Sequence, residues 1–113
     1  MRYLLLLHVD ESGWSGLTPD EQSTAMTDYA AFGQALQGSG GLVANGRLTP
    51  STAATSIRTV GGNPVTMDGP FAETKEQVAG FYLIEAASRD AALDWARRCP
   101  AAMYGTVEVR EVA

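Results

Sequence analysis

The order in which strand-like and helix-like segments follow one another is the feature that most constrains how this chain folds. Two segments with a helical apolar period, residues 18–37 and 88–99, interrupt a series of shorter strand-like runs. The strand-like runs occupy residues 3–9, 41–50, 54–62, 64–67, 78–86 and 105–112. The order β-α-β-β(β)-α-β, with one central hairpin, predicts a ferredoxin-like α+β sandwich whose two helices cover one face of the sheet.

Capping residues define the ends of both predicted helices. Thr18 can cap the first helix, Pro19 suits its first position, and Glu21 completes a capping box. Ser88 can cap the second helix, and Pro100 ends it. Residues 10–17 are predicted to form a loop, and the glycines at positions 61 and 62 predict a hairpin turn.

The second face of the predicted sheet has no helix to cover it. In the strand at 78–86, Phe81 and Leu83 share one face while Tyr82 and Ile84 share the other, so both faces are apolar. A contiguous apolar surface of this size usually marks an interface. We therefore expect a homodimer in which two sheets pack face to face.

The composition is that of one globular domain, residues 1–113. Hydrophobic residues make up 45% of the chain and charged residues 19%, which argues against disorder. The formal net charge is −5, and no basic stripe offsets it, so no nucleic-acid partner is expected.

A reducing cytoplasm is the expected location. The single cysteine, Cys99, cannot form an internal disulfide. The first apolar run, Leu4 to Leu7, ends at His8 and is too short for a signal peptide. No run approaches the roughly 18 apolar residues of a membrane span, so no membrane association is expected.

Several segments of the sequence resemble a known family. The stretches DGPFAETKEQVAGFYLIEA, AALDWARRCPAA and GTVEVREV are similar to those of YCII-related proteins, in the branch marked by a DGPF motif. MRYLLLLHVDE and GGLVANGRLTP fit the same pattern, so the resemblance covers nearly the whole chain. It implies a ferredoxin-like fold, dimeric α/β-barrel assembly and a link with extracytoplasmic-function sigma factors.

The resemblance also implies where an active site would lie in better-understood members. They carry a His on the first long helix and an Asp just before the proline that ends the second. In this sequence Tyr29 stands at the His position and Cys99 at the Asp position. The family's proposed dyad therefore does not carry over to this chain.

Polar residues near strand ends and loops are candidates for holding a ligand. We expect them at the rim of a mostly apolar cavity between sheet and helices. The candidate ligand-binding residues are His8, Tyr29, Arg58, Asp68, Glu73 and Lys75. His8 can act as acid, base or metal ligand, or serve as a hydrogen-bonded structural residue. No Cys or His partner has metal-ligand spacing to it, so neither a metal nor a cofactor is expected.

The DGPF segment has a structural as well as a functional interpretation. Asp68, Gly69 and Pro70 can form a turn without any chemistry, since Gly tolerates positive φ and Pro fixes φ. The charges of Glu73 and Lys75 either hold a polar ligand or only solvate a loop. Phe71 is expected to pack into the sheet as a core anchor, and residues 74–77 to begin a short helix.

Two classes of function follow from these candidates. The first is a binding module whose cavity orients a small molecule. The second is a cofactor-independent enzyme for an aromatic or carbonyl compound, with His8 or Asp68 as general base. A regulatory role beside a sigma factor is implied by the resemblance alone, and the sequence leaves enzyme status open.

Overall fold

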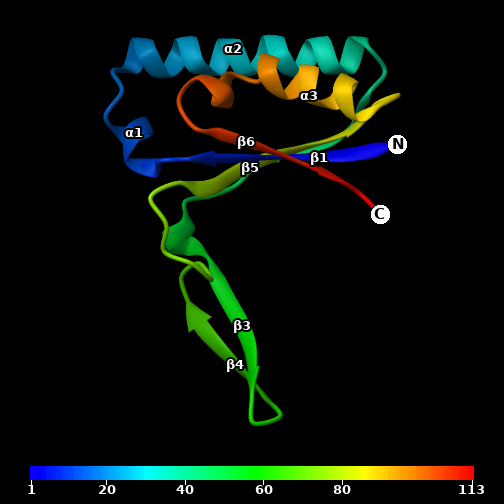
Figure 1. Ribbon diagram of the computed structural model, residues 1–113. Coiled ribbons are helices and arrows are strands. Elements are labelled where there is room, and N and C mark those ends of the chain that lie inside the picture. Colours follow the sequence, from blue (N-terminus) through cyan, green and yellow to red (C-terminus); the bar gives the residue numbers. More distant parts are fainter.

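The computed structural model describes all residues, 1–113, as a two-layer body from which one hairpin projects (Figure 1). The helices are α1 (Glu11–Ser15), α2 (Pro19–Gly38) and α3 (Arg89–Arg98), with 3-10 turns η1 (Ser51–Ala53) and η2 (Pro100–Met103). The strands are β1 (Arg2–Val9), β2 (Leu42–Arg47), β3 (Thr55–Val60), β4 (Asn63–Asp68), β5 (Gln77–Glu85) and β6 (Thr106–Glu111).

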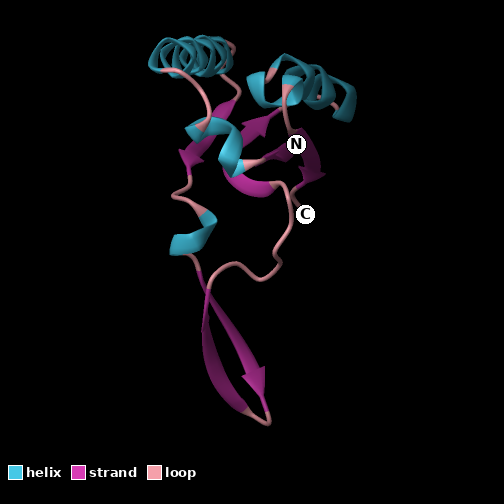
Figure 2. Ribbon diagram, turned by 90° about the vertical axis from the view of Figure 1, so that its left-hand side faces the viewer, coloured by secondary structure: helices cyan, strands magenta, loops and turns pink.

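Four strands form the main sheet, in the order β2-β5-β1-β6, and all neighbours are antiparallel. Helices α2 and α3 both lie over the same face of this sheet (Figures 1 and 2). This order and layering confirm the ferredoxin-like α+β sandwich that the sequence predicts.

The core lies between the sheet and the two long helices. Alternate β1 residues face the helices, because successive side chains of a strand point to opposite faces. Phe32 of α2 packs edge-on against Tyr82, with ring centroids 5.1 Å apart, and against Trp95 at 6.1 Å. The buried apolar residues are Tyr3, Leu5, Leu7, Phe32, Leu36, Tyr82, Ile84, Ala86, Ala92, Ala96, Cys99 and Ala101.

The predicted helix ends are confirmed. The Thr18 side chain accepts from the Glu21 amide while the Glu21 carboxylate accepts from the Thr18 amide, which is the expected capping box. The Ser88 hydroxyl accepts a hydrogen bond from the Ala91 amide at the start of α3. Pro100 follows α3 and opens η2, where its missing N–H costs nothing.

The hairpin β3–β4 is a sheet of its own and leaves the body on the side away from α2 and α3 (Figures 1 and 2). We call residues 55–68 the arm. Its turn is confirmed, since Gly61 and Gly62 have φ of 58° and 83°, as a two-residue hairpin turn requires. The central hairpin of the fold therefore does not extend the main sheet.

Three local predictions are wrong. Residues 11–15 form α1 rather than a loop, because the Asp10 side chain caps its first turn by accepting from the Ser12 amide. Residues 74–77 are not helical, because the Thr74 hydroxyl donates to the Glu76 carbonyl instead of capping a helix. The side chain of Phe71 is 85% exposed rather than a core anchor, because the chain there has left the two-layer body.

Candidate functional site

The face of the main sheet opposite the helices carries an apolar strip. We call this the open face. Cross-strand pairing places Leu4 opposite Leu83 and Leu6 opposite Phe81, and all four side chains are partly exposed. Gly46 of β2 leaves room for the Phe81 ring beside it, since a Cβ at Gly46 would come within 2.9 Å of the ring. The open face therefore combines aliphatic and aromatic surface at the centre of the sheet.

The edge of the open face along β6 carries a hydrogen-bonded ionisable cluster. The Nε2 atom of His8 lies 3.0 Å from Oε1 of Glu108, and the Nε of Arg110 donates to Oε2 of Glu108 at 2.9 Å. The three residues share this face because β1 and β6 pair in register, with Leu6 opposite Glu108 and Leu4 opposite Arg110. The carboxylate thus orients both the imidazole and the guanidinium beside the apolar strip.

Hydrogen bonds and a neighbouring positive charge favour the ionised form of the Glu108 carboxylate. The Arg110 guanidinium, and after it the hydrogen bond with His8, lowers the pKa of Glu108 below its ordinary value of 4.5. The ring of His8 is one-quarter exposed, and its Nδ1 has no hydrogen-bond partner in the chain. That nitrogen is free to accept from, or donate to, a bound molecule.

The DGPF loop lies at the end of the sheet where His8 pairs with Thr106. Gly69, with φ of +98°, donates its amide to the Ala54 carbonyl at 2.7 Å, and its own carbonyl accepts from the Ser56 hydroxyl at 2.8 Å. This positive φ is the conformation that Gly tolerates more readily than other residues. The Gln77 amide then donates to the Ala72 and Thr74 carbonyls, both at 3.0 Å, which fixes the loop shape.

Two contacts join this loop to the body near His8. The Thr106 hydroxyl, on the residue paired with His8, donates to Oε1 of Glu76 at 2.9 Å. Lys75 lies close enough to Asp10 for its charge to contribute to the lowered pKa of that carboxyl, after the larger effect of the hydrogen bonds from Ser12. The loop thus brings charged groups to the edge of the open face.

The structure separates the six candidate residues into four places. His8 lies on the open face, and Tyr29 lies on α2, on the opposite side of the sheet. Arg58 is exposed on the arm. The exposed residues of the loop and its start are Asp68, Glu73 and Lys75. No hydrogen bond or ion pair joins any of these places to another.

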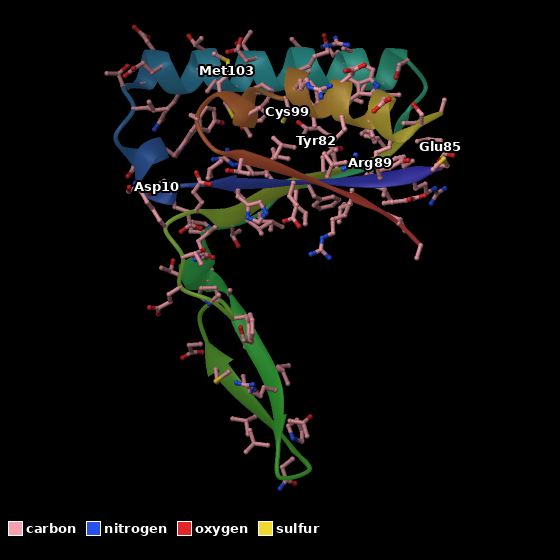
Figure 3. All side chains as sticks on the ribbon, viewed as in Figure 1. Asp10, Tyr82, Glu85, Arg89, Cys99 and Met103 are labelled. Atoms are coloured by element: carbon pink, nitrogen blue, oxygen red, sulfur yellow. The ribbon has the colours of Figure 1, made fainter.

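Tyr29 belongs to a second polar group, a pair with the exposed Tyr104 that lies on the helical side of the sheet. Its hydroxyl is hydrogen-bonded to that of Tyr104, and burial is the main cause that raises the pKa of Tyr29. Burial likewise raises the pKa of Tyr82 and of the Cys99 thiol. Both side chains lie between the helices and the sheet (Figure 3). The Cys99 thiol is therefore a buried neutral group, as its apolar position in the sequence indicates.

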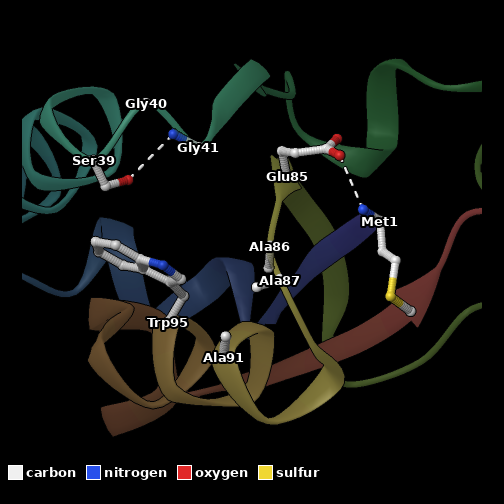
Figure 4. A pocket seen from close by; sticks show the side chains of 9 residues that line it. All are labelled: Met1, Ser39, Gly40, Gly41, Glu85, Ala86, Ala87, Ala91 and Trp95. Carbon is white, nitrogen blue, oxygen red and sulfur yellow. Dashed lines mark hydrogen bonds and ion pairs between the residues drawn. The ribbon is translucent and has the colours of Figure 1, made fainter.

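Two surface cavities lie away from the candidate residues. One, of about 430 Å³, lies where α2 ends and α3 begins, and its wall includes Met1, Glu85 and Trp95 (Figure 4). The other, of about 410 Å³, lies between α2 and η2 and is lined by residues such as Phe32 and Arg98. Neither is lined by any of the six candidate residues. The expected cavity between sheet and helices is instead largely filled by core side chains.

No group of three or more His, Cys, Asp or Glu side chains is arranged to hold a metal ion. None of the helices is long and apolar enough to cross a membrane.

Reasoning from the sequence missed Glu108 and Arg110 as partners of His8. Strand alternation in the run 105–112 does put both on the face opposite Val107 and Val109. What the pattern lacks is the register between β1 and β6, strands almost 100 residues apart, which alone places Glu108 beside His8. Gln77 is expected to help begin a helix with Thr74, but its side chain instead bonds the Ala72 and Thr74 carbonyls and fixes the DGPF loop.

Comparisons with known proteins agree with the fold. An uncharacterized protein of Rhizobium meliloti is 44% identical over 115 residues, covering 100% of this chain and 93% of its own length. The solved structure of 5-chloro-2-hydroxyhydroquinone dehydrochlorinase from Burkholderia phenoliruptrix, in complex with 2,5-dihydroxybenzoquinone, superposes with a TM-score of 0.57 at 13% identity. That match covers 100% of this chain and 94% of the enzyme, and it shows a shared fold. The YCII-related domain family matches residues 1–113, and the chain belongs to this family.

Proposed function

We propose that the protein is a face-to-face homodimer that binds a small, flat molecule between the two open faces, beside His8, Glu108 and Arg110. The observation that carries this proposal is the hydrogen-bonded His8–Glu108–Arg110 cluster at the edge of an apolar strip that nothing in the chain covers. Ligand sites typically combine apolar walls with a few convergent polar groups of this kind.

A second copy is needed to complete such a site. A single open face is a surface rather than a cavity, because its residues Leu6, Phe81 and Leu83 remain partly exposed. Two facing sheets pack about 10 Å apart. Where the apolar strips meet they would exclude water, and along the polar β6 edges a ligand would fit between them.

The cluster favours a ligand of a particular chemistry. Leu6 and Phe81 offer a flat apolar surface on which an aromatic or conjugated carbonyl compound can stack. The terminal guanidinium nitrogens of Arg110 are free to hold an oxyanion, since only its Nε contacts Glu108. The free Nδ1 of His8 can hydrogen-bond a hydroxyl or carbonyl oxygen. A hydroxylated quinone or an acidic phenol combines these features.

The fold of the dehydrochlorinase supports this class of ligand, because that protein was solved with 2,5-dihydroxybenzoquinone. We therefore choose this compound as the probe. Isothermal titration calorimetry should show saturable binding to the wild-type dimer. His8→Ala and Arg110→Ala should each weaken it by about tenfold or more, as loss of a hydrogen bond to a charged ligand does.

The matched control is Arg97→Ala on α3, which removes an exposed arginine paired only with Asp94. Binding that is unchanged in Arg97→Ala but weakened in Arg110→Ala supports the site. Saturable binding that all three variants retain places the ligand elsewhere and contradicts the proposal.

Catalysis at the same site is the second candidate function. The observation in its favour is the His8–Glu108 pair, in which a carboxylate holds an imidazole in one orientation, as in many general bases. In this role His8 takes a proton from a hydroxyl or from a carbon next to a carbonyl, without a cofactor. His8→Gln should then abolish turnover while leaving probe binding measurable. Equal turnover in His8→Gln and wild type contradicts a catalytic His8.

The other expectations remain predictions. Cytoplasmic location rests on the lone, buried Cys99, and the link with an extracytoplasmic-function sigma factor rests on the family resemblance. Arg58, Asp68, Glu73 and Lys75 remain predicted ligand contacts from the arm and loop. Tyr29 lies on the covered side of the sheet and is left out of the proposed site.

A further inference from the structure

We infer that the β3–β4 arm is a dimer clasp, whose face carrying Val60, Val65 and Met67 lies against the body of the second copy. This inference rests on the face-to-face dimer proposed above and adds to it a second contact surface.

The arm lacks the contacts that would stabilise it within its own chain. Both of its strands are exposed at almost every residue, and β3 and β4 pair only with each other. Val60 is 58% exposed and Val65 40% exposed. An isolated two-stranded hairpin is marginally stable in water, so an arm of this kind needs a surface to lie on.

One face of the arm is more apolar than the other. Cross-strand partners share a face, so Val60, Val65 and Met67 lie together, beside their partners Asn63, Arg58 and Ser56. The opposite face carries Ile57 and Pro64 among threonines. Three apolar side chains spaced from root to tip form a continuous strip suited to packing along another element.

The direction of the arm indicates that a second copy of the chain packs against it. The arm descends from the sheet on the side of the open face, away from α2 and α3 (Figures 1 and 2). A copy packed on the open face would occupy the space next to the arm. The open face and the arm therefore border the same volume and form one continuous interface.

The length of the arm fits this arrangement. Each strand has six residues. At about 3.4 Å per residue the arm reaches about 20 Å, whereas a facing sheet lies about 10 Å away. The arm therefore passes the edge of the partner's sheet and reaches the level of its helices.

The root of the arm is fixed rather than loose. Gly69 and Ser56 bond across the root, and both the Ser51 amide and hydroxyl donate to the Glu11 carboxylate at 2.7 Å. These bonds hold η1 and the arm to α1 and set the direction of the arm before dimerisation. A preset direction lowers the entropy lost on association.

Sedimentation equilibrium on the full-length chain tests this inference. Val65→Ser should weaken the dimer by about tenfold, since it uncovers part of the apolar strip. Ile57→Ser is the control on the opposite face of the same arm. Ile57 is 70% exposed against 40% for Val65, so this variant removes more exposed apolar surface, yet it should leave the dimer constant unchanged. Equal dimer constants for Val65→Ser and wild type contradict the clasp.

Hydrogen exchange gives an independent readout of the arm in the wild type. The arm peptide, residues 55–68, should exchange slowly in the dimer and rapidly in the open-face variant Leu6→Asp. Rapid exchange of the arm in a wild-type dimer overturns the clasp and leaves the face-to-face dimer standing. A wild-type monomer, or a Leu6→Asp variant that stays fully dimeric, overturns the face-to-face dimer and with it the clasp that rests on it.

Discussion

His8 and Glu108 lie on neighbouring strands, diagonally across the β1–β6 pair, and meet at 3.0 Å on the face of the sheet that no helix covers. The relationship matters because it joins the single histidine of the chain to a carboxylate that Arg110 also holds. Diagonal pairs on one face of a sheet are within reach of long side chains, so the register alone produces this cluster.

The pH dependence of stability provides a first test of this cluster. The lowered pKa of Glu108 means that its contribution is present above the ordinary value of 4.5 and is lost as the pH falls through the depressed value. The melting temperature of the wild type should therefore drop more steeply with acid than that of Glu108→Gln. Glu73→Gln, an exposed carboxyl without a hydrogen bond in the chain, should behave as the wild type. Parallel acid profiles for wild type and Glu108→Gln contradict the pairing.

The dependence of stability on alkaline pH tests the face of the sheet that the helices cover. Burial raises the pKa of Tyr29 and Tyr82 above 10.0 and that of Cys99 above 9.0. A raised pKa contributes stability that is fully present below the unfolded value and is lost as the pH rises. The melting temperature should thus fall above about pH 9 to 10, and the fall should be shallower in Tyr29→Phe.

Tyr104→Phe is the control for that experiment, because it removes the same Tyr29–Tyr104 hydrogen bond while leaving the buried phenol of Tyr29 in place. It should retain the steep alkaline fall. If both variants show the same shallow slope, the hydrogen bond rather than the buried phenol determines the alkaline profile.

The conformation of Gly69 predicts a backbone effect without a packing effect. Its φ is +98°, yet a Cβ there would meet no atom within 4 Å. Gly69→Ala should therefore lower the free energy of unfolding by more than about 1 kcal/mol through backbone strain alone. Gly33, in the middle of α2 and equally free of neighbours, is the control. Gly33→Ala should raise the free energy of unfolding by about 0.4–1 kcal/mol, and a loss at Gly33 or none at Gly69 would refute this account.

Phe71 and Phe32 differ sharply in burial and should differ in stability. Phe71 is 85% exposed, so Phe71→Ala should change the free energy of unfolding by no more than about 0.5 kcal/mol. Phe32 is 5% exposed, so Phe32→Ala should cost about 3–5 kcal/mol. Urea denaturation measures both. A loss of several kcal/mol at Phe71 would show that something outside this chain covers it.

Local patterns in the sequence predict most of the fold. Strand alternation correctly assigns Phe81 and Tyr82 to opposite faces, and capping residues such as Thr18 and Ser88 define the helix ends, because these signals act between near neighbours. Local patterns do not predict whether residues 54–67 join the main sheet. Nothing in its alternation distinguishes a strand of the main sheet from a separate arm, since that depends on pairing with distant strands.

The candidate site is predicted only in part, for the same reason. His8 is identifiable as the only histidine, but Glu108 and Arg110 become its neighbours through pairing between the two ends of the chain. Phe71 is an error of the opposite kind, because a residue expected in the core lies outside it. A large apolar residue beside a turn suggests burial, but the DGPF loop runs outside the two-layer body and leaves it exposed.

The association state measures the central claim most directly, because the proposed site exists only between two open faces. Sedimentation velocity at micromolar protein should give a dimer for the wild type. Leu83→Asp, on the open face, should give a folded monomer or an unfolded chain. Met26→Asp, an exposed apolar residue on α2, should remain dimeric. A wild-type monomer at this concentration, or a Leu83→Asp variant that stays as dimeric as Met26→Asp, would contradict the account.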